Sequence, residues 1–178
     1  MIQLAIINVN CRLSLQVVFN FNNYTSRDDL VAAINNIRYG GHFPNIPDAL
    51  AVVRSNIFAT SNGARQDSSV LRLAVVFVTE TMSRYRDSTL TESRAVADMD
   101  IGIVTVGVGT FLDRELLLSI TSYPSNENMF IAPSVRNVPD LADSIKRIIC
   151  SGMLCYVNCV VRFLLYLFRA ITPQPAQL

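Results

Sequence analysis

The sequence predicts an α/β fold: a three-layer, Rossmann-like, doubly wound and mostly parallel sheet with an antiparallel hairpin at one edge. Two continuous apolar runs, residues 71–78 and 101–108, have the composition of strands that are buried on both faces of a parallel sheet. From the first run onward, segments with helical spacing of apolar residues alternate with strand-like segments. This alternation is typical of a doubly wound sheet.

The first half of the chain predicts a hairpin followed by two helices. Residues 2–9 and 13–21 are rich in aliphatic side chains, and the short polar stretch between them favours two adjacent strands. A helix is expected at 25–37, where a hydroxyl residue can cap the first turn and acidic residues follow it. A second helix is expected at 48–59, where the apolar residues form a stripe.

The second half predicts three strands that alternate with three helices. The run 71–78 is the first of these strands, and 101–108 is another central strand. The remaining expected elements are a strand at 129–131 and helices at 89–99, 113–122 and 138–149.

Length and charge limit what the chain can be. At 178 residues it is long enough for one domain with a proper core and too short for two ordinary domains. Half of the residues are hydrophobic (51%) and only 16% are charged, so a globular core is expected. The net charge is +1 and the basic residues do not cluster, so nothing in the charge pattern favours a nucleic-acid partner.

The two ends differ from the body of the chain. The first residues lack a basic segment followed by a separate apolar one, so they indicate a strand and no signal peptide. Beyond residue 150 a hydrophobic tail begins, and 153–171 is close to membrane-spanning length. Arg162 lies near the middle of that stretch, where it would cost roughly 2.5–3.5 kcal/mol. A packing or interfacial helix, or a tail unrelated to the domain, is therefore the favoured interpretation over a span.

Neither the cysteines nor the single histidine predicts a metal framework. Cys155 and Cys159 lie in the hydrophobic tail without the paired spacings of a zinc module, and His42 is the one histidine. Disulfides are expected only in an extracellular chain, and the residues leave the pairing open.

The order and spacing of several segments resemble a known family. They are YTSRDDLVAAINNIRYGG, IPDAL, LRLAVVFVTET, IGIVTVGVG, ELLLSITSYP and MFIAP. Residues 2–150 are similar to a von Willebrand factor type A domain, of the extracellular-matrix type found in collagens, matrilins and mussel byssal matrix proteins. This resemblance implies a domain at 1–150, a separate tail at 151–178, and a role in protein binding.

The resemblance also implies a metal-ion-dependent adhesion site, and this sequence departs from its pattern. The family takes its ligands from three loops at the carboxyl ends of the strands, where Mg²⁺ needs hard oxygen donors in octahedral order. The Asp-x-Ser-x-Ser loop after the first strand is absent, and the second loop reads Pro-Asn-Ile at 44–46. The third loop is Thr79-Glu80-Thr81, where Thr-Asp-Gly is usual. We therefore expect Glu80 to be a remnant of the third metal loop, with no confident metal ligand and no Mg²⁺.

The resemblance implies that the first strand of the fold, which is central in the sheet, is missing together with its helix. Without that strand, two sheet edges would be exposed or forced together, which favours aggregation. We therefore hypothesise that the chain is a fragment, or an incomplete gene model, of a larger secreted protein.

Two further features concern an extracellular location. Asn23-Tyr24-Thr25 is an N-glycosylation sequon, which makes Asn23 a candidate acceptor. Cys150 follows the terminal helix, where the family resemblance implies a disulfide cysteine. The usual partner precedes the missing first strand, so Cys11 and Cys150 are disulfide candidates without an assigned pairing.

No arrangement in the sequence predicts an enzyme. His42 has no nearby partner that would make it a catalytic base, and Gly107-Val108-Gly109 lacks the spacing of a dinucleotide-binding loop. The expected function is a non-enzymatic protein-binding or adhesion module of a secreted, extracellular matrix-type protein. Its expected partners are collagen or other matrix proteins. The alternative is a membrane-tethered protein anchored by residues 153–171.

Overall fold

The computed structural model describes residues 5–10, 14–37, 45–67, 70–79, 81 and 85–150. Strand β1 (Ile6–Asn10) pairs with β2 (Ser14–Phe19) in an antiparallel hairpin. Strands β3 (Leu73–Val78), β4 (Gly102–Val108) and β5 (Met129–Ala132) form a parallel sheet in that order. The helices are α1 (Arg27–Asn35), α2 (Ile46–Val52), α3 (Arg86–Ala97), α4 (Arg114–Ile120), the short α5 (Ser125–Asn128) and α6 (Val138–Cys150).

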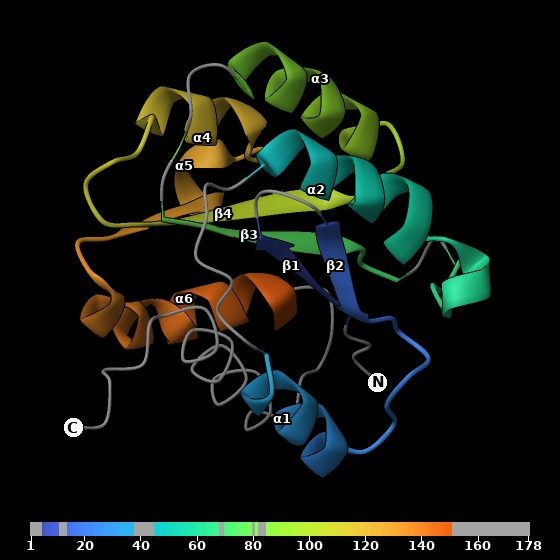
Figure 1. Ribbon diagram of the computed structural model, residues 1–178. Helices are drawn as coiled ribbons and strands as arrows, with labels where there is room; N and C mark the ends of the chain where they lie inside the picture. The colour runs from blue at the N-terminus through green and yellow to red at the C-terminus, as the bar shows by residue number, and fades with distance from the viewer. Residues whose placement is uncertain are drawn as a thin grey trace.

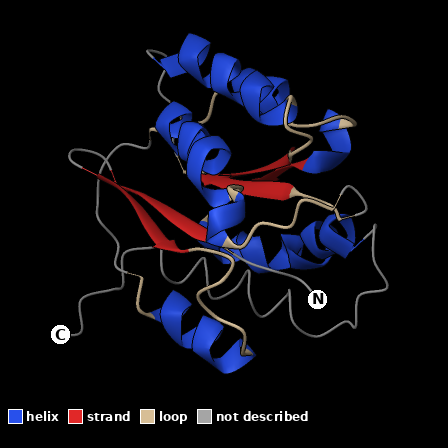
Figure 2. Ribbon diagram, turned by 90° about the vertical axis from the view of Figure 1, so that its right-hand side faces the viewer, coloured by secondary structure: helices blue, strands red, loops and turns tan. Residues whose placement is uncertain are grey.

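The helices cover both faces of the strands, so the three-layer α/β architecture is confirmed for the described residues. Helices α2, α3, α4 and α5 lie on one side, and α1 and α6 lie on the other (Figure 1). The view turned by 90° shows the same sandwich of helices around the strands (Figure 2). Strand β4 is buried from Ile103 to Val108, as expected for a strand that is paired on both edges and covered on both faces.

One part of the predicted topology differs. The sequence predicts a single mostly parallel sheet with the hairpin at its edge, whereas the described strands form two separate sheets. A strand joins a sheet through a ladder of backbone hydrogen bonds, and the ladder of β1 and β2 runs between those two strands. The hairpin joins the domain through its side chains instead. Ile7 and Val17 pack against the core under α2, and Ile6 and Phe19 form a cluster with α1.

Two helices begin earlier than predicted. Helix α3 starts at Arg86 because the hydroxyls of Ser88 and Thr89 donate to the Tyr85 carbonyl inside the first turn, at 3.0 and 2.6 Å. Helix α2 starts at Ile46, capped by the Asn45 side chain, and continues as a π-helical turn, Val53–Ile57.

The main core lies between the sheet and helices α2, α3 and α4. It includes Leu50, Val96, Leu116 and Leu117, which pack with the inward side chains of β3 and β4. A second cluster joins the other face of β4 and β5 to α6 through Val138 and Ile145. None of the helices that the structure describes is long and apolar enough to cross a membrane. The predicted tail at 151–178 lies outside the described residues.

We expect Leu117→Ala to lower the free energy of unfolding by about 2–5 kcal/mol, because it opens a cavity where the side chain is fully buried. The neighbouring Leu118→Ala is the matched control, since Leu118 is 41% exposed and a surface truncation costs about 0.5 kcal/mol or less. Urea unfolding of both variants measures the difference. Equal losses would contradict the assigned core.

Candidate functional site

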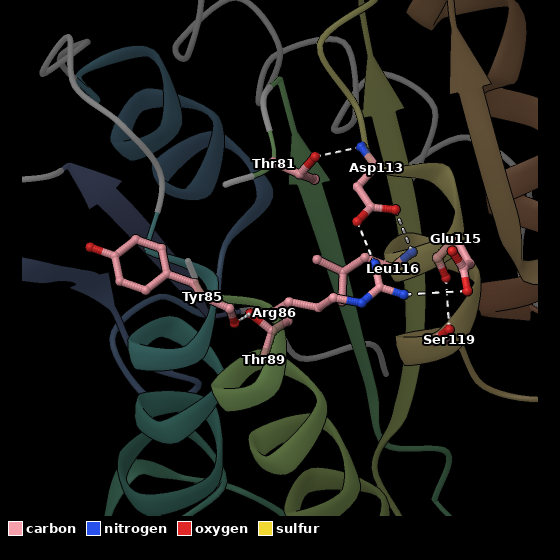
Figure 3. A network of polar contacts seen from close by, with 8 residues as sticks. All are labelled: Thr81, Tyr85, Arg86, Thr89, Asp113, Glu115, Leu116 and Ser119. Atoms are coloured by element: carbon pink, nitrogen blue, oxygen red, sulfur yellow. Dashed lines mark hydrogen bonds and ion pairs between the residues drawn. The ribbon is translucent and has the colours of Figure 1, made fainter. Parts of the chain in front are cut away.

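The carboxyl ends of β3 and β4 meet at one edge of the sheet, and polar side chains gather there. Thr79 and Thr81 follow β3, and the loop 109–113 follows β4 before α4 begins. Ligands of open α/β sheets bind at this edge, so we call it the strand-end face. Figure 3 shows the contacts that organise it.

Thr81 holds the loop after β4 through two hydrogen bonds. Its backbone N–H donates to the carbonyl of Phe111 at 3.1 Å. Its Oγ1 accepts from the backbone N–H of Asp113 (Figure 3). Thr81, which the sequence places in the third metal loop, thus connects the segment after β3 to the loop after β4.

Asp113 joins this tie to helix α4. Its Oδ1 accepts from the Leu116 backbone N–H at 2.9 Å, which makes it the N-cap of the helix. Its Oδ2 contacts Arg86 Nη1 at 2.5 Å. The Leu116 hydrogen bond, followed by the bond and charge of Arg86, lowers the pKa of Asp113 below the ordinary value of 3.8, although partial burial acts the other way.

Arg86 supplies the positive charge at this edge. It lies in the first turn of α3, where the helix dipole disfavours a cation. Two carboxylates offset that placement, because Nη2 also lies 3.4 Å from Glu115 Oε1 (Figure 3). The side chains of Arg86 and Asp113 are 32% and 33% exposed, so the pair is partly shielded from water.

Two glycines shape the end of β4. Gly109 has φ +101°, which favours glycine, and its N–H donates to Ala132 of β5 at 2.9 Å. A Cβ on Gly107 would lie 2.7 Å from Leu112 and 2.8 Å from Ile131, so the sheet has no room for one without a shift. Gly109 therefore allows the chain to turn at the end of β4, and Gly107 serves close packing.

The structure tests the other predicted site residues unevenly. Glu80, His42 and Cys11 lie outside the described residues, and the side chain of Cys150 is not described at the end of α6. Asn23 is exposed together with the rest of its sequon, and its Oδ1 accepts from the Asn20 N–H at 2.6 Å.

The second loop is described from Asn45 onward. Asn45 Oδ1 accepts from the Asp48 backbone N–H at 3.3 Å, and Ile46 is buried, 6% exposed. Asn45 is therefore a helix cap, and Ile46 offers no oxygen donor. Within the part of the chain that the structure describes, no group of three or more His, Cys, Asp and Glu side chains could hold a metal ion.

Sequence reasoning missed the role of Arg86. Asp113 was readable as the start of a helix, but the partner of its carboxylate lies 27 residues earlier in the chain. No local spacing signals such a pair.

A double-mutant cycle with Arg86→Met and Asp113→Asn tests the ion pair. We expect a coupling free energy of about 0.5–1 kcal/mol at neutral pH, because the pair is partly shielded but not buried. The folded-state pKa of Asp113 is lowered, so its stabilisation is complete above 3.8 and is lost as the pH falls through the folded-state value. Chemical unfolding of the unmodified chain, the two single variants and the double variant measures the coupling free energy at neutral pH and its loss at about pH 3. Coupling that is absent at neutral pH, or undiminished in acid, would refute the pair.

Most of the chain is similar to proteins of one family. The model of the von Willebrand factor type A domain matches residues 2–144. Mouse matrilin-1 is 25% identical over 137 residues, which cover 77% of this chain and 26% of matrilin-1. Bovine matrilin-1 is 25% identical over 151 residues, which cover 84% and 27%. The chain thus spans about a quarter of the length of these curated relatives.

The solved structures of proximal thread matrix protein 1 from the mussel byssus share the fold. Two of them match with TM-scores of 0.72 and 0.71 at 14% and 15% identity, covering 83% of this chain and 36% of theirs. A third, with a zinc-occupied metal-ion-dependent adhesion site, has a TM-score of 0.70 at 15% identity, covering 83% and 35%. With the family model matching most of its length, the chain belongs to the von Willebrand factor type A domain family.

Proposed function

We propose that the chain is a non-enzymatic protein-binding module of an extracellular matrix-type protein, and that its strand-end face binds protein without a metal ion. The observation that carries the proposal is the network of Thr81, Arg86 and Asp113. Family membership and the similarity to matrilin-1 and to a byssal matrix protein support the adhesion role. Collagen or other matrix proteins are the proposed partners.

Metal independence is supported by what the oxygen atoms at this edge already contact. Thr81 Oγ1 accepts from the chain, and both oxygens of Asp113 are engaged by Leu116 and Arg86. Mg²⁺ needs near-octahedral oxygen ligands and a site of negative charge. The Arg86 guanidinium beside the carboxylates of Asp113 and Glu115 supplies positive charge there and opposes a second cation.

The proposed location is extracellular. The exposed sequon at Asn23 supports it, because a glycan acceptor must lie on the surface. Expression through a secretory pathway followed by an N-glycosidase tests whether Asn23 carries a glycan.

We expect the chain to bind immobilised fibrillar collagen or a decellularised matrix equally well in MgCl₂ and in EDTA. Arg86→Met removes the cation that positions Asp113 and Glu115, and it should weaken binding at least about fivefold. Biolayer interferometry measures both effects.

Arg54→Met is the matched control, because Arg54 pairs with Glu92 at 3.3 Å, away from the strand-end face. The control should bind as the unmodified chain does. Binding that disappears in EDTA would overturn metal independence, and no binding to any matrix preparation would overturn the adhesion role.

A further inference from the structure

The amino ends of β3 and β4 border a hollow of about 600 Å³. Its walls are apolar, because Leu73 of β3, Val104 of β4 and Phe130 of β5 line it. Tyr123, 93% exposed, and Leu71, 52% exposed, line it as well. They are two of the six large apolar side chains that are exposed in the described part of the chain. Apolar side chains that gather at one hollow favour an occupant that covers them.

Four polar side chains of the hollow are already engaged by the chain itself. Ser122 Oγ accepts from the Ile103 backbone N–H at 2.8 Å, and Asn128 Nδ2 donates to the Ser122 carbonyl at 3.1 Å. Arg147 Nη2 donates to Ser144 Oγ at 3.0 Å. A site for a polar small molecule presents a few polar groups that converge on the ligand. These internal contacts therefore favour an apolar occupant over a polar one.

The chain leaves helix α6 beside this hollow. Ile148 lines the hollow, and α6 ends two residues later, at Cys150. Gly152 follows, and glycine commonly lets the chain turn after a helix. Met153 comes five residues after Ile148, and five residues span at most about 18 Å. The start of the apolar stretch 153–171 is therefore within reach of the hollow.

The apolar stretch 153–171 has the composition of such an occupant. Its charged residues are Arg162 and Arg169, and Met, Leu, Val, Phe, Ile and Tyr make up most of the rest. A segment on a short link meets its site at an effective concentration in the millimolar range, which a free partner in solution has to match. The short connection therefore favours this stretch over a separate protein or a second copy.

We propose that the apolar stretch 153–171 docks into the hollow of its own chain, beginning with Met153 and Leu154. Docking removes apolar side chains of both the stretch and the hollow from water, which is the force that drives it. The hollow lies at the end of the sheet opposite the strand-end face. The docking therefore goes beyond the proposed function and does not depend on it.

Cross-linking in the full chain tests where the stretch lies. Glu127 lines the hollow and is exposed, so Glu127→Cys places a thiol there without altering the core. Cys155 supplies the second thiol. A short bismaleimide should join the two within one molecule, and mass spectrometry of the digested product identifies the linked peptides.

Asp87→Cys is the matched control, because it removes the same charge from an exposed position in the first turn of α3, at the strand-end face. It should give at least about tenfold less of the link to Cys155. Equal yields from the two variants overturn the proposal. Links between different molecules, in a mixture of isotopically labelled and unlabelled chain, overturn it as well.

Filling the hollow tests whether the stretch occupies it. Ser144→Trp adds an indole to the lining from α6 and should displace the stretch. Cleavage by trypsin after Arg162 should then become at least about tenfold faster, because a released segment is open to the protease. Ser119→Trp is the matched control, since it makes the same change at an exposed position of α4.

Equal cleavage rates after Arg162 in both variants and the unmodified chain overturn the docking. Should Ser144→Trp lose the circular dichroism of the unmodified chain, the cross-linking of Glu127→Cys, at an exposed position, decides the proposal alone.

A lipid membrane is the alternative location of the same stretch. In a density gradient with phosphatidylcholine vesicles, the full chain should stay below the vesicles, because its apolar stretch is already covered. A chain that floats with the vesicles overturns the docking. Neither result affects the proposed function, since matrix binding in EDTA is measured separately.

Discussion

The burial of β4 is the constraint on which the rest of the structure depends. Residues from Ile103 to Val108 are buried, and parallel neighbours occupy both edges of the strand. Such a strand needs an apolar layer on each face, which α3 and α4 supply on one side and α6 on the other. Because the three strands run parallel, their carboxyl ends also meet at one edge. The strand-end face is thus a consequence of the same constraint.

At that edge, polar groups from different segments of the chain contact one another. Thr81 and Asp113 tie the segment after β3 to the loop after β4, and Arg86 brings α3 into the same network. The family resemblance implies a divalent cation at the carboxyl ends of the strands, and one of the byssal structures has a zinc-occupied metal-ion-dependent adhesion site. In our account the guanidinium supplies the positive charge from within the chain, and the face is left as an ordered protein surface that carries Phe111.

The sequence predicted the strands and helices whose buried side chains give a regular order of apolar residues along the chain. It did not predict interactions between residues that lie far apart in the sequence. The runs at β3 and β4 were readable because a strand buried on both faces is apolar throughout. The start of α3 was placed at residue 89, three residues late, because Tyr85 precedes the helix without a side-chain cap that the sequence could signal. The pairing of Arg86 with Asp113 could not be predicted, since only the fold brings the start of α3 beside the start of α4. The separate hairpin was missed because strand pairing is also a property of the whole fold.

The ionisation of Asp113 tests most directly whether Arg86 organises this face. Nuclear magnetic resonance of the side-chain carboxyl carbon, followed through a pH titration, reports the pKa of that residue alone. The account predicts a pKa below 3.8 in the unmodified chain, and a partial rise toward 3.8 in Arg86→Met, because the Leu116 hydrogen bond remains. A pKa at or above 3.8, or one that does not change when Arg86 is replaced, would contradict it.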